Sequence, residues 1–144
     1  MTAPVFVDSN VFVYALDDAD RRKRDAARAW RAMLWSTRLG RISFQVLNEF
    51  YINAARLTPA AVDQVRAEVR DLLAWRPIVV DAAVIELGWK LQDRYHLSYW
   101  DSLIVAAAKS LSCGYLLSED LQEGQDLNGV RVINPFTQTP DSLL

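Results

Sequence analysis

Five short apolar runs, separated by longer segments with helical periodicity, constrain the fold of this chain most strongly. The runs are residues 4–7, 42–44, 77–80, 115–117 and 130–133. Runs of this length predict buried β-strands, and apolar residues that recur every three or four positions predict helices between them. Because short apolar strands alternate with helices, we predict an α/β sandwich with a central, mostly parallel sheet.

Helices are expected between and beside these strands. They are predicted over residues 11–16, 20–37, 45–56, 58–75, 81–95 and 99–112. The last of these is apolar in nearly every direction from Leu103 to Leu111, so we expect it to be central and buried. At 144 residues the chain suits one domain, which we place at residues 1–136, followed by a C-terminal tail at 137–144.

Composition excludes several classes of protein. The lone Cys113 cannot form an internal disulfide or a cysteine zinc cluster, and the lone His96 excludes a two-histidine ribonuclease. The N-terminus has no basic leader and no apolar run approaches the length of a membrane span, so a cytoplasmic protein without membrane contact is predicted. A net charge of −2 indicates that any contact with nucleic acid is local, metal-bridged or assisted by a partner.

Four acidic residues stand where the predicted fold gathers function. Asp8 directly follows the first strand, and Asp120 comes shortly after strand 115–117, so both belong at the carboxyl edge of the sheet. Asp101 lies in the first turn of the apolar helix, and Glu49 lies beside the apolar face of its own helix. Each also has an ordinary interpretation, as a helix cap, a turn acid, a partner of the helix dipole or a surface ion pair.

Convergence of these carboxylates would have a chemical consequence. Their mutual repulsion would raise the pKa of some of them unless a cation lay between them. A hard divalent ion such as Mg²⁺ prefers oxygen ligands, lowers the pKa of a bound water and stabilises charge on a phosphodiester. If the four acids converge, the site they form would therefore suit metal-assisted hydrolysis of a phosphodiester.

Four segments carry a family resemblance: FVDSNVFVYAL, SFQVLNEFY, LSYWDSLIVAAA and LLSED. In this order and spacing they resemble the PIN-domain nucleases, especially the VapC-like toxins of bacterial toxin–antitoxin pairs, over residues 5–136. The resemblance implies a three-layer sandwich with about five strands. It assigns Asp8, Glu49, Asp101 and Asp120 as ligands of Mg²⁺ or Mn²⁺, with Asn10 orienting the first acid and Ser9 supplying a nearby hydroxyl.

The resemblance also implies partners and products. It predicts an RNA substrate cut to leave a 5′-phosphate and a 3′-hydroxyl, a homodimer, and inhibition by a cognate antitoxin protein. One position departs from the pattern, because Gln122 stands where many relatives carry a further acid. Whether Glu123 or Asp126 takes that role in a second metal site stays open.

Three other functions fit parts of the sequence. A strand ending in Asp8 also suits an aspartate-nucleophile phosphatase of the haloacid-dehalogenase type, although Asn10 stands where that family has its second aspartate. The chain could instead be a PIN-like scaffold that binds RNA or protein without cutting, or a housekeeping nuclease.

Arginine and tryptophan residues have less specific interpretations. A basic stripe either guides an RNA backbone or is the ordinary solvated face of helix 20–37, and its members are Arg21, Arg24, Arg28 and Arg31. Trp30, Trp75 and Trp89 are expected to fill the core. Trp35 and Trp100 are expected at a dimer or antitoxin surface, because aromatic residues are enriched in interfaces.

Overall fold

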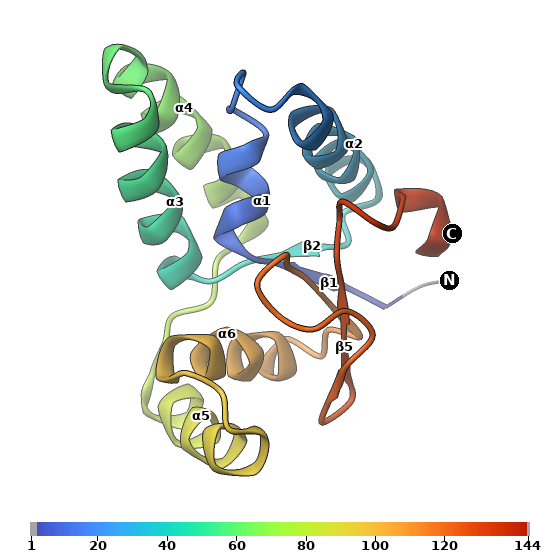
Figure 1. The fold of residues 1–144 in the computed structure, drawn as a ribbon. Coiled ribbons are helices and arrows are strands. Elements are labelled where there is room, and N and C mark those ends of the chain that lie inside the picture. The colour runs from blue at the N-terminus through green and yellow to red at the C-terminus, as the bar shows by residue number, and fades with distance from the viewer. Residues whose placement is uncertain (1–2, 144) are drawn as a thin grey trace.

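The computed structural model describes residues 3–143, in which a five-stranded sheet lies between two helical layers (Figure 1). The strands are β1 (Val5–Val7), β2 (Gly40–Arg41), β3 (Tyr115–Leu117), β4 (Asp126–Leu127) and β5 (Val130–Ile133). Their order is β2-β1-β3-β5-β4, and neighbouring strands are parallel except for the antiparallel pair β4 and β5. The predicted α/β sandwich with a mostly parallel sheet is confirmed.

Helices cover both faces of this sheet. They are α1 (Ser9–Tyr14), α2 (Arg21–Thr37), α3 (Phe44–Leu57), α4 (Val62–Leu72), α5 (Ala82–Tyr95) and α6 (Tyr99–Ser110). Figure 1 shows α1 to α4 on one side and α5 and α6 on the other. Side-chain oxygens of Asp20, Ser43, Asp81 and Ser98 cap the helices that follow them, as N-cap residues commonly do. Within residues 3–143, no helix is long and apolar enough to cross a membrane.

Three local predictions are wrong. The expected helix over residues 58–75 is divided into a 3-10 turn (Pro59–Ala61), α4 and a second 3-10 turn (Leu73–Trp75). Thr58 does not cap it with its side chain, because its hydroxyl donates back to the carbonyl of Ala54 at 2.9 Å. The strand predicted at residues 42–44 lies instead at residues 40–41, because Ser43 already caps α3.

The third wrong prediction is the strand at residues 77–80. Ile78 makes one isolated bridge to Ser43, and its backbone bonds go to Ile42 and Phe44 at the junction of β2 and α3. Conversely, the pair Asp126–Leu127 forms a strand that was not expected. It pairs with β5 across the Asn128-Gly129 turn, where both turn residues have positive φ as the hairpin requires.

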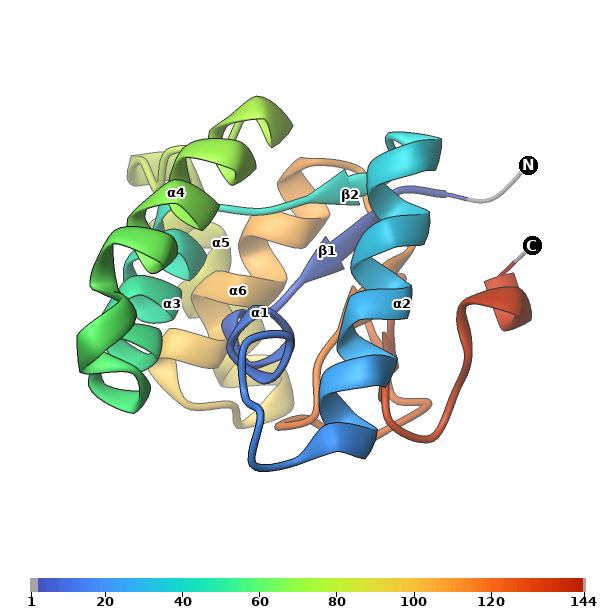
Figure 2. The ribbon, with the colours of Figure 1, turned by 90° about the horizontal axis from the view of Figure 1, so that it is seen from above.

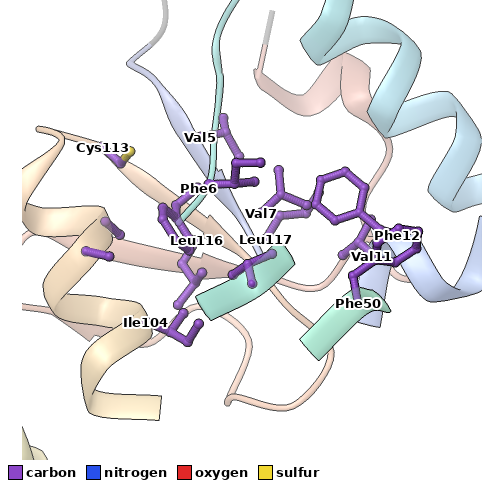
Figure 3. Packing of buried hydrophobic residues seen from close by; sticks show 14 of the residues in the cluster. Val5, Phe6, Val7, Val11, Phe12, Phe50, Ile104, Cys113, Leu116 and Leu117 are labelled. Carbon is purple, nitrogen blue, oxygen red and sulfur yellow. The ribbon is translucent and has the colours of Figure 1, made fainter. Parts of the chain in front are cut away.

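The core lies on both sides of the sheet. Residues 102–108 of α6 are all buried, which confirms that this helix is central. Figure 3 shows side chains of β1 and β3 packed between Ile104 of α6 and the aromatic rings of Phe12 and Phe50. Trp30 is fully buried, whereas Trp89 is 52% exposed on α5, so its predicted place in the core is wrong.

Trp30 also holds the C-terminal segment against the domain. Its indole Nε1 donates to the carbonyl oxygens of Pro135 at 3.1 Å and Gln138 at 3.0 Å. Figure 2 shows this segment running alongside α2 before its final 3-10 turn (Pro140–Leu143). Residues 137–143 therefore lie against the same body as the preceding chain.

Trp30→Phe is expected to lower the free energy of unfolding by roughly 1–3 kcal/mol. The smaller ring leaves a void, and the two carbonyls lose their donor. Urea unfolding would measure the change, with Trp89→Phe as the control, since an exposed ring contributes within about 0.5 kcal/mol. Equal losses in the two variants would show that the indole contacts do not stabilise the fold.

Candidate functional site

Asp8 forms the buried centre of a polar network at the carboxyl edge of the sheet. It follows β1 directly and caps α1, where its Oδ1 accepts a hydrogen bond from the backbone N–H of Ser9 at 2.7 Å. Its Oδ2 accepts from the hydroxyl of Ser118 at 2.8 Å. The Asp8 side chain is thus fixed from both oxygens, and the residue is only 4% exposed.

Burial changes the acidity of this carboxyl group. It raises the pKa of Asp8 to about 6, against the lowering effect of the hydrogen bonds from Ser118 and Ser9. The nearby charges of Asp120 and Glu49 act in the same direction as burial and contribute a smaller part of this rise in the pKa. Among residues 3–143, no lysine or arginine forms an ion pair with Asp8. A cation placed here would offset both the cost of burying the charged Asp8 carboxylate and its repulsion from Asp120 and Glu49.

Asn10 joins Asp8 to Asp120. Its Nδ2 donates to Asp120 Oδ2 at 3.0 Å and lies 3.4 Å from both Asp8 Oδ2 and Ser118 Oγ. The opposite amide orientation would turn an oxygen toward two carboxylates, so the acceptors determine how this side chain lies. Asn10 Oδ1 is left buried without a hydrogen-bond partner in the described part of the chain.

Glu49 enters the network from α3. Its Oε2 accepts from the Ser9 hydroxyl at 3.1 Å, and its Oε1 accepts from Gln45 Nε2 at 2.9 Å. The Ser9 bond joins the first turn of α1 to α3, so Glu49 lies beside Asp8 although 40 residues separate Ser9 from Glu49. Glu49 was predicted beside the apolar face of its helix, and its side chain points from there toward the carboxyl edge of the sheet.

Asp101 approaches from α6 on the other side. It lies in the first turn of that helix, where Ser98 Oγ accepts from its backbone N–H at 3.1 Å. Burial raises the pKa of Asp101, the hydrogen bond with Ser98 lowers it, and the charge of Asp120 raises it. All four predicted acids are thus coupled, since Asp120 affects Asp8 and Asp101 while Glu49 affects Asp8.

The donor set suits a hard divalent cation that keeps water ligands. Within residues 3–143, no three Asp, Glu, His or Cys side chains close on a single point as a ready-made metal cluster. Mg²⁺ does not require such a cluster, because it is usually held by one or two carboxylates and retains several waters. The four carboxylates offer only oxygen ligands, so the residues fit Mg²⁺ or Mn²⁺.

Two residues of this network were not predicted from the sequence. Ser118 is fully buried directly after β3 and contacts Asp8, Asn10 and the backbone N–H of Asp120. Because Ser118 directly follows a parallel strand, as Asp8 does, the same argument from the sequence could have placed it at the carboxyl edge of the sheet. Gln45 was also missed, although it lies one helical turn before Glu49 on the same face.

Other candidate residues make contacts elsewhere. Glu123 accepts from the Thr137 hydroxyl at 2.6 Å, and Asp126 accepts from the backbone N–H of Gly129 at 2.7 Å. Neither forms a hydrogen bond to Asp8, Glu49 or Asp120 in the described residues. Asp126 thus serves the β4–β5 turn in this structure.

Three of the four arginines of the α2 stripe form polar contacts within the protein. Arg24 forms ion pairs with Asp18 and Asp25, Arg28 donates to the carbonyl of Ala15, and Arg31 pairs with Glu68. These contacts match the interpretation of the stripe as an ordinary polar helix face.

An apolar groove of about 530 Å³ adjoins the network at Glu49. Phe44 and Ile52 of α3 and Trp100 of α6 line it, and their exposed fractions are 40%, 50% and 62%. The exposure of Trp100 and of Trp35, at 46%, agrees with the surface positions expected for both.

Comparisons with solved structures show the same fold in proteins of low sequence identity. A toxin–antitoxin complex from Klebsiella pneumoniae contains a chain 20% identical, with a TM-score of 0.58 and coverage of 92% of this chain and 98% of that one. The DNA-bound VapBC complex from Salmonella typhimurium gives 16% identity, a TM-score of 0.65 and coverage of 92% and 98%. VapBC2 from Rickettsia felis, bound to a promoter DNA fragment, gives 15%, 0.59, 90% and 97%.

Sequence comparison gives the family. No curated protein matches the chain. The PIN domain, however, matches residues 5–122, a span that includes Asp8, Glu49, Asp101 and Asp120. Since that match covers most of the sequence, the chain belongs to the PIN-domain family.

Proposed function

We propose that this protein is a metal-dependent endoribonuclease and the toxin of a VapC-type toxin–antitoxin pair. The observation that carries the proposal is Asp8, a buried carboxyl group of raised pKa, coupled to Asp120 and Glu49 at the carboxyl edge of the sheet. An inert binding scaffold has no electrostatic reason to keep such a cluster of like charges. Membership of the PIN-domain family supports the same reaction.

In this proposal Asp8, Glu49, Asp101 and Asp120 hold Mg²⁺, with Mn²⁺ as a substitute. The bound ion supplies Lewis acidity, which makes water a stronger nucleophile and offsets charge on the phosphodiester. Asn10 and Ser118 hold the Asp8 and Asp120 carboxylates in place, and Ser9 holds Glu49. Such preorganisation means that little rearrangement is needed when charge develops in the transition state.

The partners are proposed on the same basis. RNA would be cut to leave a 5′-phosphate and a 3′-hydroxyl. The three similar structures are toxin–antitoxin or VapBC complexes, which supports a cognate antitoxin for this chain. We further propose a homodimer acting in the cytoplasm, with residues 1–136 as the catalytic domain.

The metal requirement provides the first test. Purified protein, freed of any bound partner, should cut total RNA into discrete fragments with Mg²⁺ or Mn²⁺ and leave it intact with EDTA. Activity should return when excess Mg²⁺ is added to the EDTA sample, and end-labelling should detect 5′-phosphates. RNA binding without cleavage in either metal would contradict the nuclease and favour the scaffold.

A further inference from the structure

Gln45 connects two of the elements that carry the candidate ligands. Its Nε2 donates a hydrogen bond to Glu49 Oε1 at 2.9 Å, and Glu49 lies one turn later on the same helix. A second contact of Nε2 reaches the carbonyl oxygen of Trp100 at 3.3 Å, in the first turn of α6. Asp101 is the next residue, so a single amide joins Glu49 to the backbone turn that bears Asp101.

The chemistry of the two partners determines the orientation of this amide. A carboxylate and a carbonyl only accept hydrogen bonds, and a rotated amide would turn its own oxygen toward both of them. In the observed orientation Gln45 Oε1 is buried and has no hydrogen-bond partner within residues 3–143. A buried polar atom without a partner is unfavourable for stability, and such atoms in folded proteins call for an explanation.

The surroundings make the choice of glutamine more informative. Gln45 lines the groove beside Phe44, Trp100 and Leu103, where an apolar side chain would pack without leaving an unpaired oxygen. Asn48 lines the same groove from the same helix, yet its side chain forms no hydrogen bond in the described part of the chain. An amide side chain that lines this groove therefore does not form such hydrogen bonds by default. The two bonds of Gln45 depend on its position on α3.

We infer that Gln45 is a positioning residue that sets the placement of the Glu49 carboxylate relative to Asp101 for binding of a divalent cation. This inference rests on the proposed function. The neutral donors Gln45 and Ser9 fix both oxygens of Glu49 and leave its negative charge available. Mg²⁺ tolerates little departure from octahedral geometry, so a carboxylate that swings on a long side chain is a poorer ligand than one held in place.

Binding of Mn²⁺ to the protein without RNA tests this role directly. Gln45→Met keeps the length of the side chain and removes its donor, and Asn48→Met makes the same change at the control position. We expect Mn²⁺ affinity, measured by calorimetry, to fall about 10- to 100-fold in Gln45→Met, the usual effect of losing a residue that orients a ligand. Asn48→Met should bind Mn²⁺ as tightly as the unsubstituted protein does. In EDTA, both variants should unfold at nearly the same temperature as the unsubstituted protein.

A second measurement needs no substitution and stays decisive if Gln45→Met does not fold. In the ¹⁵N-labelled protein, the side-chain amide resonances of Gln45 should shift as Mg²⁺ is added, and those of Asn48 should not. Unchanged Mn²⁺ affinity in a folded Gln45→Met variant, or Gln45 resonances that ignore Mg²⁺, would overturn the positioning role alone. Failure of the unchanged protein to bind either ion would overturn the proposed function, and the positioning role with it.

Discussion

Asp8→Asn is expected to reduce metal-dependent RNA cleavage on the order of 10²- to 10³-fold, the loss that follows removal of one group that stabilises transition-state charge. Asparagine has nearly the same shape, and its oxygen can still accept from the Ser9 N–H that caps α1. The substitution therefore removes the negative charge with little change in the fold. Initial cleavage rates of an end-labelled RNA in saturating Mg²⁺ would measure the effect.

A matched control separates charge at this position from charge in general. Asp93 is an exposed carboxylate on α5, and Asp93→Asn should cleave RNA at the unchanged rate. Because Asp8 is 4% exposed and coupled to Asp120 and Glu49, only its loss alters the site. An Asp8→Asn variant that cuts as fast as Asp93→Asn would exclude Asp8 from the reaction.

The same substitution is expected to stabilise the metal-free protein at neutral and higher pH. Folding raises the pKa of Asp8 from 3.8 to about 6, so the folded state holds this proton more tightly than the unfolded chain does. The stability that Asp8 contributes is therefore fully present below about pH 4 and is lost as the pH rises through about 6. At pH 8 the difference amounts to about 3 kcal/mol, since one pKa unit corresponds to about 1.4 kcal/mol.

Thermal or urea unfolding of the two proteins in EDTA from pH 4 to pH 8 would measure this difference. We expect the stability of Asp8→Asn minus that of the unchanged protein to grow between pH 4 and pH 7 and then level off. Excess Mg²⁺ at pH 8 should reduce or reverse the gap, because an ion that binds only the folded state stabilises it by mass action. A gap that does not vary with pH would contradict the raised pKa of Asp8.

Much of the fold was predictable because its signals are local. Caps such as Asp81 and Ser98 place helix starts to within a residue or two, and the apolar content of α6 predicts its burial. The errors fall where local pattern and tertiary context disagree. Residues 77–80 have the composition of a strand, yet the segment makes one isolated bridge, to Ser43 between β2 and α3, and does not join the sheet.

The candidate site likewise contains residues that local signals predict and residues whose role depends on tertiary packing. Asp8 and Asp120 could be placed from strand ends alone, and the structure brings both to one amide of Asn10. Ser118 shares the strand-end signal, but its hydrogen bond to Asp8 spans 110 residues and the contact of Gln45 with Trp100 spans 55, so neither partner could be identified from the sequence. Such pairings depend on how separate elements pack, which no local pattern in one sequence records.

The order of strands also affects when the site can form during synthesis. β1 lies between β2 and β3, and its register with β3 pairs Val7 with Leu117. A nascent chain can pair β1 with β2 early, but β1 stays open on its other edge until residues 115–117 of β3 have left the ribosome. Asp8 and Asp120 meet only in that step, so a chain released before residue 120 can form the contact of Ser9 with Glu49 but lacks the complete candidate site.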